Sequence, residues 1–168
     1  MVGSSILPVT IYKNKLYFLF GKENPNEKSA PGWSDFGGRI ETTETPLQGA
    51  IREGCEEMSG FLGDEKQLKA LIQKNGGTMR IDHNNNNHTY YVHLFYIDYD
   101  PSLPMYYNNT HKYMWDKIDQ ASPLFEKIEI RWFSESELKK SRFKFRPFYR
   151  KIVDVIITKN KEISDFIA

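Results

Sequence analysis

Two apolar runs near the start of the chain predict a β-hairpin. The stretch from Ile6 to Phe20 is rich in β-branched, aromatic and leucine side chains, and only the polar segment from Tyr12 to Lys15 interrupts it. Trp33 to Glu41 follows as extended chain and contains the glycine pair Gly37-Gly38. Paired glycines indicate a positive φ or a close approach of the backbone to another group.

Helical periodicity begins at Thr45 and is expected to continue to Met58. Thr45 is a suitable helix cap, Pro46 fits the first helical position, and Gln48 can complete a capping box. Ser59-Gly60 is expected to end this helix, because glycine readily adopts the left-handed conformation.

The middle of the chain predicts a short helix over Glu65 to Gln73 and, after an asparagine-rich loop at Asn84 to Asn87, a strand buried on both faces over Thr89 to Tyr99. Pro101 to Leu124 lacks clean periodicity. We expect an irregular excursion there, with a short helix around Tyr113 to Ile118.

One strand followed by helices is predicted for the last part of the chain. Glu129 to Phe133 is the expected strand, and Ser134 with Glu137 forms a second capping box. Pro147 opens a helix whose apolar stripe is Tyr149, Ile152, Val153 and Ile156. A chain of 168 residues is the usual size of one compact domain, so residues 1–168 are expected to form one domain, and there is no internal repeat.

Charge and cysteine content exclude several kinds of function. The chain has 23 lysines and arginines against 22 aspartates and glutamates, so overall charge favours neither nucleic-acid coating nor a membrane-surface role. Cys55 is the only cysteine, which excludes a disulfide within the chain and a CxxC site. Lys13 to Lys15 interrupts the first apolar run, so it is neither a membrane span nor a signal peptide. A cytoplasmic protein is expected, and a homodimer is a reasonable expectation.

Three glutamates of the first helix point to a metal ion. Leu47, Ile51 and Met58 fall on one side of the helix with Gly54 and Cys55, and this side is expected to face the core. Glu53, Glu56 and Glu57 fall away from it, close enough to repel one another. No lysine on the helix pairs with them, so a bound cation would relieve the repulsion. Hard oxygen ligands favour Mg²⁺ or Mn²⁺ over zinc.

The spacing of these residues resembles the Nudix box. From Gly38 the chain has five residues, Glu44, seven residues, Arg52-Glu53, two residues and Glu56-Glu57. Chance would produce these six fixed positions in only ~1 of 10⁵ chains of this size.

Four positions depart from the family's pattern. Gly54 replaces an aliphatic residue, Ser59 and Gly60 stand where glycine and an aliphatic residue are usual, and Phe36 replaces the proline before the glycine pair. Gly54 is expected to weaken the helix by roughly 1 kcal/mol relative to alanine. None of the four removes a carboxylate.

The resemblance implies both a fold and a set of roles. The fold would be α+β, an α/β/α sandwich with a mixed β-sheet and a loop-helix-loop catalytic motif. Glu56 and Glu57 would bind Mg²⁺, with Glu53 completing the site and the Gly38 carbonyl as a further ligand. Glu44 would act from outside the direct ligands of the metal, or hold another metal. Arg52 would orient a neighbouring glutamate. Among the candidates for general base, which include Glu41, we rank Glu53 first.

Substrate contacts are less well indicated. Trp33, Arg39 and His93 are candidates, although a core position is the ordinary role of a tryptophan and a hydrogen-bonded strand position that of a histidine. His83, His88 and His93 recur at five-residue intervals, but a zinc site is not favoured because the first two flank the asparagine loop.

The leading hypothesis is Mg²⁺-dependent hydrolysis of a pyrophosphate bond in a nucleoside triphosphate, a deoxynucleoside triphosphate or a dinucleotide. One alternative is removal of an mRNA cap, favoured by a basic cluster that could grip RNA. That cluster comprises Lys139, Lys140, Arg142, Lys144, Arg146, Arg150 and Lys151. The other alternative is a non-catalytic nucleotide-binding module, against which the full acidic set argues.

Overall fold

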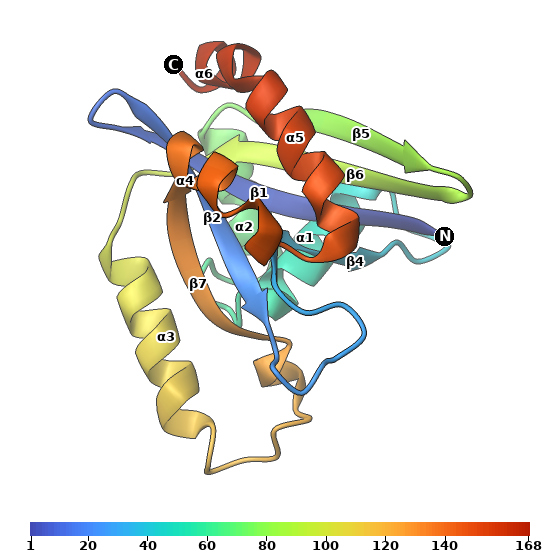
Figure 1. Ribbon diagram of the computed structural model, residues 1–168, viewed down its shortest axis with the longest axis vertical. Coiled ribbons are helices and arrows are strands. Elements are labelled where there is room, and N and C mark those ends of the chain that lie inside the picture. Colours follow the sequence, from blue (N-terminus) through green and yellow to red (C-terminus); the bar gives the residue numbers. More distant parts are fainter.

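A mixed seven-stranded sheet forms the centre of the computed structural model, which describes residues 1–168 (Figure 1). The long strand β1 (Val2–Tyr12) lies at the centre of this sheet. β1 pairs antiparallel with β2 (Lys15–Glu23) and β4 (Phe36–Arg39), and parallel with β6 (His88–Tyr96). The hairpin expected over the first apolar runs is therefore present, and its turn residues Lys13 and Asn14 have positive φ.

Three further strands extend the sheet on its two sides. β5 (Met79–Asn85) pairs antiparallel with β6, while β3 (Trp33–Ser34) and β7 (Lys127–Ser134) both pair antiparallel with β2. β5 was not predicted, because it is an edge strand in which only Ile81 is buried. An apolar alternation is consequently absent from its sequence.

Helices cover both faces of the sheet (Figure 1). One face carries α1 (Pro46–Glu57), α2 (Glu65–Lys74) and α3 (Ser102–Met114), while the other carries α4 (Glu135–Lys140), α5 (Arg150–Thr158) and α6 (Asn160–Ile167). Short 3₁₀ turns occupy Pro123–Phe125, Arg142–Lys144 and Pro147–Tyr149. The predicted α/β/α sandwich is confirmed.

Alternation along the central strands builds a separate core on each face. Ile6 of β1 and Leu19 of β2 pack toward α1 and α2, whereas their neighbours Leu7 and Phe18 pack toward α5. All four side chains are fully buried. Because both faces are covered, the strands contain continuous apolar runs rather than a polar side.

Local signals placed several helix boundaries correctly. Thr45 and Ser134 each form the expected capping box, and Ser59 and Gly60 have positive φ where the first helix was expected to end. No helix in the structure combines the length and the apolar character required to cross a membrane.

The prediction for Pro101 to Leu124 was wrong. A regular helix, α3, occupies Ser102–Met114, instead of an irregular segment with a short helix near Tyr113. Only Tyr107 and His111 of this helix are buried, so its apolar stripe is too narrow to show as periodicity. The side-chain amide of Asn108 fixes the helix instead, through hydrogen bonds with both backbone groups of Ile130.

Candidate metal and substrate site

The helix α1 packs directly against the sheet at Gly54, and this contact positions the site. A Cβ on Gly54 would lie 2.4 Å from Cδ1 of Ile6, so only glycine allows this approach. The departure from the family pattern at Gly54 thus has a packing reason. Ala50, Gly54 and Glu57 form the stripe of the helix that faces the sheet.

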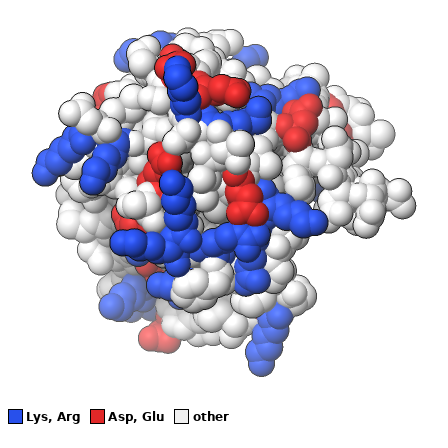
Figure 2. Space-filling model, turned by 45° about the horizontal axis from the view of Figure 1, so that its top comes forward, with Lys and Arg blue, Asp and Glu red and all other residues white.

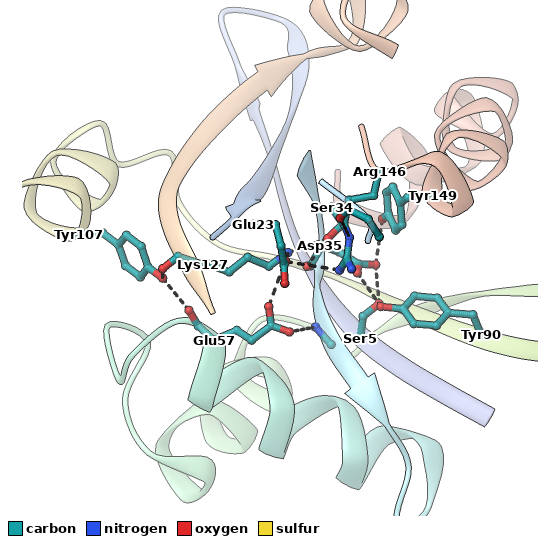
Figure 3. A network of polar contacts seen from close by, with 12 residues as sticks. Ser5, Glu23, Ser34, Asp35, Glu57, Tyr90, Tyr107, Lys127, Arg146 and Tyr149 are labelled. Carbon is teal, nitrogen blue, oxygen red and sulfur yellow. Dashed lines mark hydrogen bonds and ion pairs between the residues drawn. The ribbon is translucent and has the colours of Figure 1, made fainter. Parts of the chain in front are cut away.

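Glu57 is buried on this stripe, and the expectation that it would point away from the core was wrong. One of its oxygens accepts a hydrogen bond from the backbone N–H of Gly37 at 3.0 Å, and the other lies 3.6 Å from the ammonium group of Lys127 (Figure 3). Burial raises the pKa of the Glu57 carboxyl to about 8, although the positive charge of Lys127 opposes the rise. Ala50 and Gly54 leave space on this side of the helix, and Lys127 on β7 supplies a positive charge, so the Glu57 carboxylate can be buried between α1 and the sheet.

Three carboxylates converge at this end of α1. Oxygens of Glu53, Glu57 and Glu126 all lie within 4.8 Å of one another. Burial, and then the charges of Glu53 and Glu56, raise the pKa of Glu126. Such a set of hard oxygen donors fits Mg²⁺ or Mn²⁺. We refer to Glu53, Glu57 and Glu126 as the carboxylate cluster.

Glu126 was missed by the sequence analysis. It follows the 3₁₀ turn Pro123–Phe125 and directly precedes β7, in a segment without a motif. Only the pairing of β7 with β2 brings it to α1, so no local pattern identifies it.

Arg52 fixes the orientation of Glu53. Its guanidinium donates to Glu53 at 2.9 Å, to both oxygens of Glu44 at 2.7 and 2.9 Å, and to the carbonyl oxygen of Arg39 at 3.0 Å. These hydrogen bonds, above all those to Glu44, raise the pKa of Arg52, and they lower the pKa of Glu44. Glu44 thus acts on the cluster through Arg52.

Glu56 lies outside the carboxylate cluster. Its side chain is 56% exposed, and its nearest cationic partner is Arg52 at 3.8 Å. Burial and the neighbouring charge of Glu53 raise its pKa. Glu56 therefore borders the site from the solvent side.

The glycine pair of β4 lies directly against the cluster. A Cβ on Gly38 would lie 2.6 Å from the carboxyl carbon of Glu53 and 2.8 Å from each of its oxygens. Gly38 therefore leaves the space that the Glu53 carboxylate occupies.

The cavity that borders the glycine pair measures about 410 Å³. A hollow of about 550 Å³ lies between the β1–β2 turn and α6, away from every carboxylate of the cluster. The smaller one, which we call the arginine cavity, is lined by Gly37, Gly38, Arg39, Tyr90, Arg146 and Phe148 among others. Its volume is typical of small-molecule sites, which hold roughly 300–1,000 Å³.

Of the three residues predicted to contact substrate, only Arg39 lines the arginine cavity. Trp33 is buried in the core, where its ring packs edge-on against Phe133 at 5.1 Å. His93 is buried, and its Nδ1 lies 3.1 Å from the carbonyl oxygen of Ser5; burial lowers its pKa. His83 and His88 line the cavity, separate from His93.

A buried carboxyl group supports the wall of the arginine cavity (Figure 3). Asp35 accepts hydrogen bonds from the hydroxyls of Ser5 at 2.5 Å, Tyr90 at 2.7 Å and Tyr149 at 2.8 Å. Burial raises its pKa, and the three donors oppose this rise. The network fixes the ring of Tyr90, which was not among the predicted site residues.

The basic cluster is partly neutralised. Arg142 forms a two-point ion pair with Asp154, and Arg150 donates to the carbonyl oxygens of Phe143 and Phe145. Figure 2 shows blue and red side chains interleaved on this side of the molecule. The face is therefore not an uninterrupted cationic surface of the kind that grips a nucleic-acid backbone.

A protein-family model matches most of this chain. The model described as the NUDIX domain matches residues 4–156. A 59-residue segment, 34% of this chain, is 42% identical to uncharacterized protein L534 of Acanthamoeba polyphaga mimivirus and spans 19% of that protein.

Two solved structures share the fold at low sequence identity. A bifunctional NMN adenylyltransferase/ADP ribose pyrophosphatase from Francisella tularensis, complexed with AMP and a manganese ion, is 22% identical with a TM-score of 0.58, over 94% of this chain and 41% of that one. The NUDIX domain of Shewanella oneidensis NrtR, complexed with ADP ribose, is 12% identical with a TM-score of 0.51, over 96% and 86%. This chain therefore corresponds to less than half of the Francisella protein.

Proposed function

Since this chain belongs to the NUDIX domain family, whose model matches residues 4–156, we propose that it is a hydrolase that cleaves the pyrophosphate bond of a substrate containing a nucleoside diphosphate. The single observation that carries the proposal is the convergence of three carboxylates within 4.8 Å beside a glycine strand that also lines a cavity. The ligands named for the two structural neighbours, AMP with manganese and ADP ribose, agree with this substrate class.

Glu53, Glu57 and Glu126 are proposed to hold Mg²⁺, for which Mn²⁺ can substitute. Glu56 borders the site, and the Gly38 carbonyl is a further proposed ligand. When bound, the cation would neutralise phosphate oxygens and lower the pKa of a coordinated water. Arg52 keeps the Glu53 carboxylate in place, since it also anchors on Glu44.

In the proposed reaction, water adds to a phosphorus of the pyrophosphate and the bridging P–O bond breaks. Glu53 is proposed to accept the proton of the attacking water, because its carboxylate is oriented by Arg52 at the edge of the cluster. A dinucleotide or another diphosphate diester gives two phosphate monoesters, and a nucleoside triphosphate gives a monoester and pyrophosphate. The arginine cavity is proposed to hold the nucleotide part of the substrate.

The test is a panel of phosphoanhydrides that includes nucleotides, dinucleotides and capped RNA, assayed with Mg²⁺, Mn²⁺ or EDTA. We expect metal-dependent hydrolysis by the wild type and a loss of at least ~100-fold in kcat/KM for Glu57→Gln. Glu65→Gln, an exposed carboxylate on α2, is the matched control and should retain activity. Equal turnover of every substrate by wild type and Glu57→Gln would refute the proposal.

A further inference from the structure

Two hollows of opposite electrostatic character flank the carboxylate cluster. The arginine cavity lies on one side. On the other side is a hollow of about 310 Å³, which we call the amide hollow; its lining includes Glu23, Asn24, Asn26, Glu27, Gln120 and Glu126. Glu126 belongs to the cluster, so this second hollow begins at the proposed metal site.

The arginine cavity suits an anionic and aromatic group. Arg39 and Arg146 line it, and its lining contains no carboxylate side chain. Phe148 is 47% exposed, with the Arg146 guanidinium 4.9 Å from its ring centroid and Tyr90 edge-on at 6.4 Å. An exposed aromatic face stacks on bases, and guanidinium groups bind phosphate. A nucleoside phosphate therefore matches this cavity.

The amide hollow suits a neutral group with hydroxyls. No lysine or arginine lines it, and its carboxylates belong to Glu23, Glu27 and Glu126. Gln120 connects the two segments that line the amide hollow. The Gln120 side chain accepts a hydrogen bond from the Asn26 side chain at 3.2 Å, and the Gln120 backbone carbonyl accepts one from the Asn24 side chain at 3.0 Å. Carboxylate and amide oxygens accept hydrogen bonds from hydroxyls. A phosphate in the amide hollow would instead be repelled by the three carboxylates, since no lysine or arginine lines it.

An ion pair separates the two hollows. Arg146, from the arginine cavity, lies 3.4 Å from Glu23 of the amide hollow, and Glu23 also lies 3.3 Å from Lys127. Lys127 in turn contacts Glu57, so the boundary lies beside the cluster (Figure 3). A pyrophosphate held at the cluster would thus direct its two ends into environments of different charge.

We propose that the chain selects substrates in which a nucleoside diphosphate is joined to a neutral, hydroxyl-bearing group, and that it discriminates against nucleoside triphosphates. The inference rests on the proposed function and adds the chemistry of the second end of the substrate. The nucleotide occupies the arginine cavity, and the hydroxyl-bearing group occupies the amide hollow.

The test compares kcat/KM for a nucleoside diphosphate hexose and for the nucleoside triphosphate of the same base, in Mg²⁺. We expect the wild type to prefer the first by at least ~10-fold. Gln120→Lys and Glu27→Lys each place a cation at the amide hollow and should reduce this ratio by at least ~10-fold. Gln73→Lys, the same change on the exposed side of α2, should leave the ratio unaltered. Phe148→Ala should raise KM for both substrates by a similar factor, since they share the nucleotide.

The outcomes separate the two proposals. Hydrolysis with the triphosphate preferred, or an unchanged ratio in both Gln120→Lys and Glu27→Lys, overturns the selectivity inference and leaves the proposed function standing. Absence of hydrolysis across the whole panel by the wild type overturns the proposed function, and this inference with it.

Discussion

Replacing Lys127 by methionine tests how the metal-free protein tolerates the buried carboxylate of Glu57. The Lys127 side chain is 1% exposed, and its ammonium donates to the Ser34 hydroxyl at 2.6 Å while facing Glu23 and Glu57 at 3.3 and 3.6 Å. Methionine retains most of the apolar stem that packs against Gly21. The change therefore removes the charge with little loss of packing.

The expected effect follows from burial. Glu23 retains Arg146 as a partner, but Glu57 is 6% exposed and loses its cationic partner. Glu57 is ionised only above its pKa of about 8, and protonation of the carboxyl limits the loss to about 1.4 kcal/mol for each pH unit above that value. At about pH 9 the free energy of unfolding should therefore fall by about 1–2 kcal/mol. Saturating Mg²⁺ supplies a replacement positive charge and stabilises the folded state by binding it, by about 2.7 kcal/mol at 100 times the dissociation constant. Mg²⁺ should therefore restore much of the loss.

Urea denaturation at about pH 9, in EDTA and in Mg²⁺, measures both effects. Lys139→Met is the matched control, because that lysine is 58% exposed and its ion pair with Glu135 is expected to contribute at most about 1 kcal/mol. Lys127→Met combined with Glu57→Gln should be less destabilised than Lys127→Met alone, since no unpaired carboxylate remains. A Lys127→Met protein as stable as wild type in EDTA, or a defect that Mg²⁺ leaves unchanged, would refute the reasoning.

Three further predictions concern the same helix and its surroundings. The pKa of Glu57 is raised from 4.5 to about 8, so the neutral carboxyl stabilises the fold fully below pH 4.5, and this contribution is lost as pH rises from 4.5 to 8. In EDTA, wild type should therefore lose stability relative to Glu57→Gln over this window. A difference in free energy of unfolding that stays constant with pH in urea titrations would argue against it. Gly54→Ala should lower the free energy of unfolding by about 1–3 kcal/mol despite alanine's helix propensity, because its methyl would overlap Ile6; a rise in Tm would contradict this. Gly38→Ala should displace the Glu53 carboxylate, reducing kcat/KM by ~10-fold or more with a smaller change in Tm, and unaltered kinetics would exclude that contact.

Local signals made α1 predictable. The capping box of Thr45 and the terminal Ser59-Gly60 depend on residues within one or two turns, so their pattern is visible in the sequence. The spacing from Gly38 to Glu57 likewise belongs to one continuous segment. These signals sufficed for the helix, for the acidic set and for the family.

Other features depend on contacts between distant segments. The burial of Glu57 requires Lys127 on β7, 70 positions along the chain, and Glu126 reaches the cluster only through the pairing of β7 with β2. Arg146 was recognised only as one member of a basic cluster, because its place beside Glu23 depends on tertiary structure. No periodicity or spacing in the sequence contains this information.

Titration of Mn²⁺ followed by electron paramagnetic resonance tests the proposed metal site most directly. Wild type should bind the ion, and Glu53→Gln, Glu57→Gln and Glu126→Gln should each weaken binding by at least ~10-fold, whereas Glu65→Gln should not. Mn²⁺ binding that is undiminished in all three cluster variants would contradict the account.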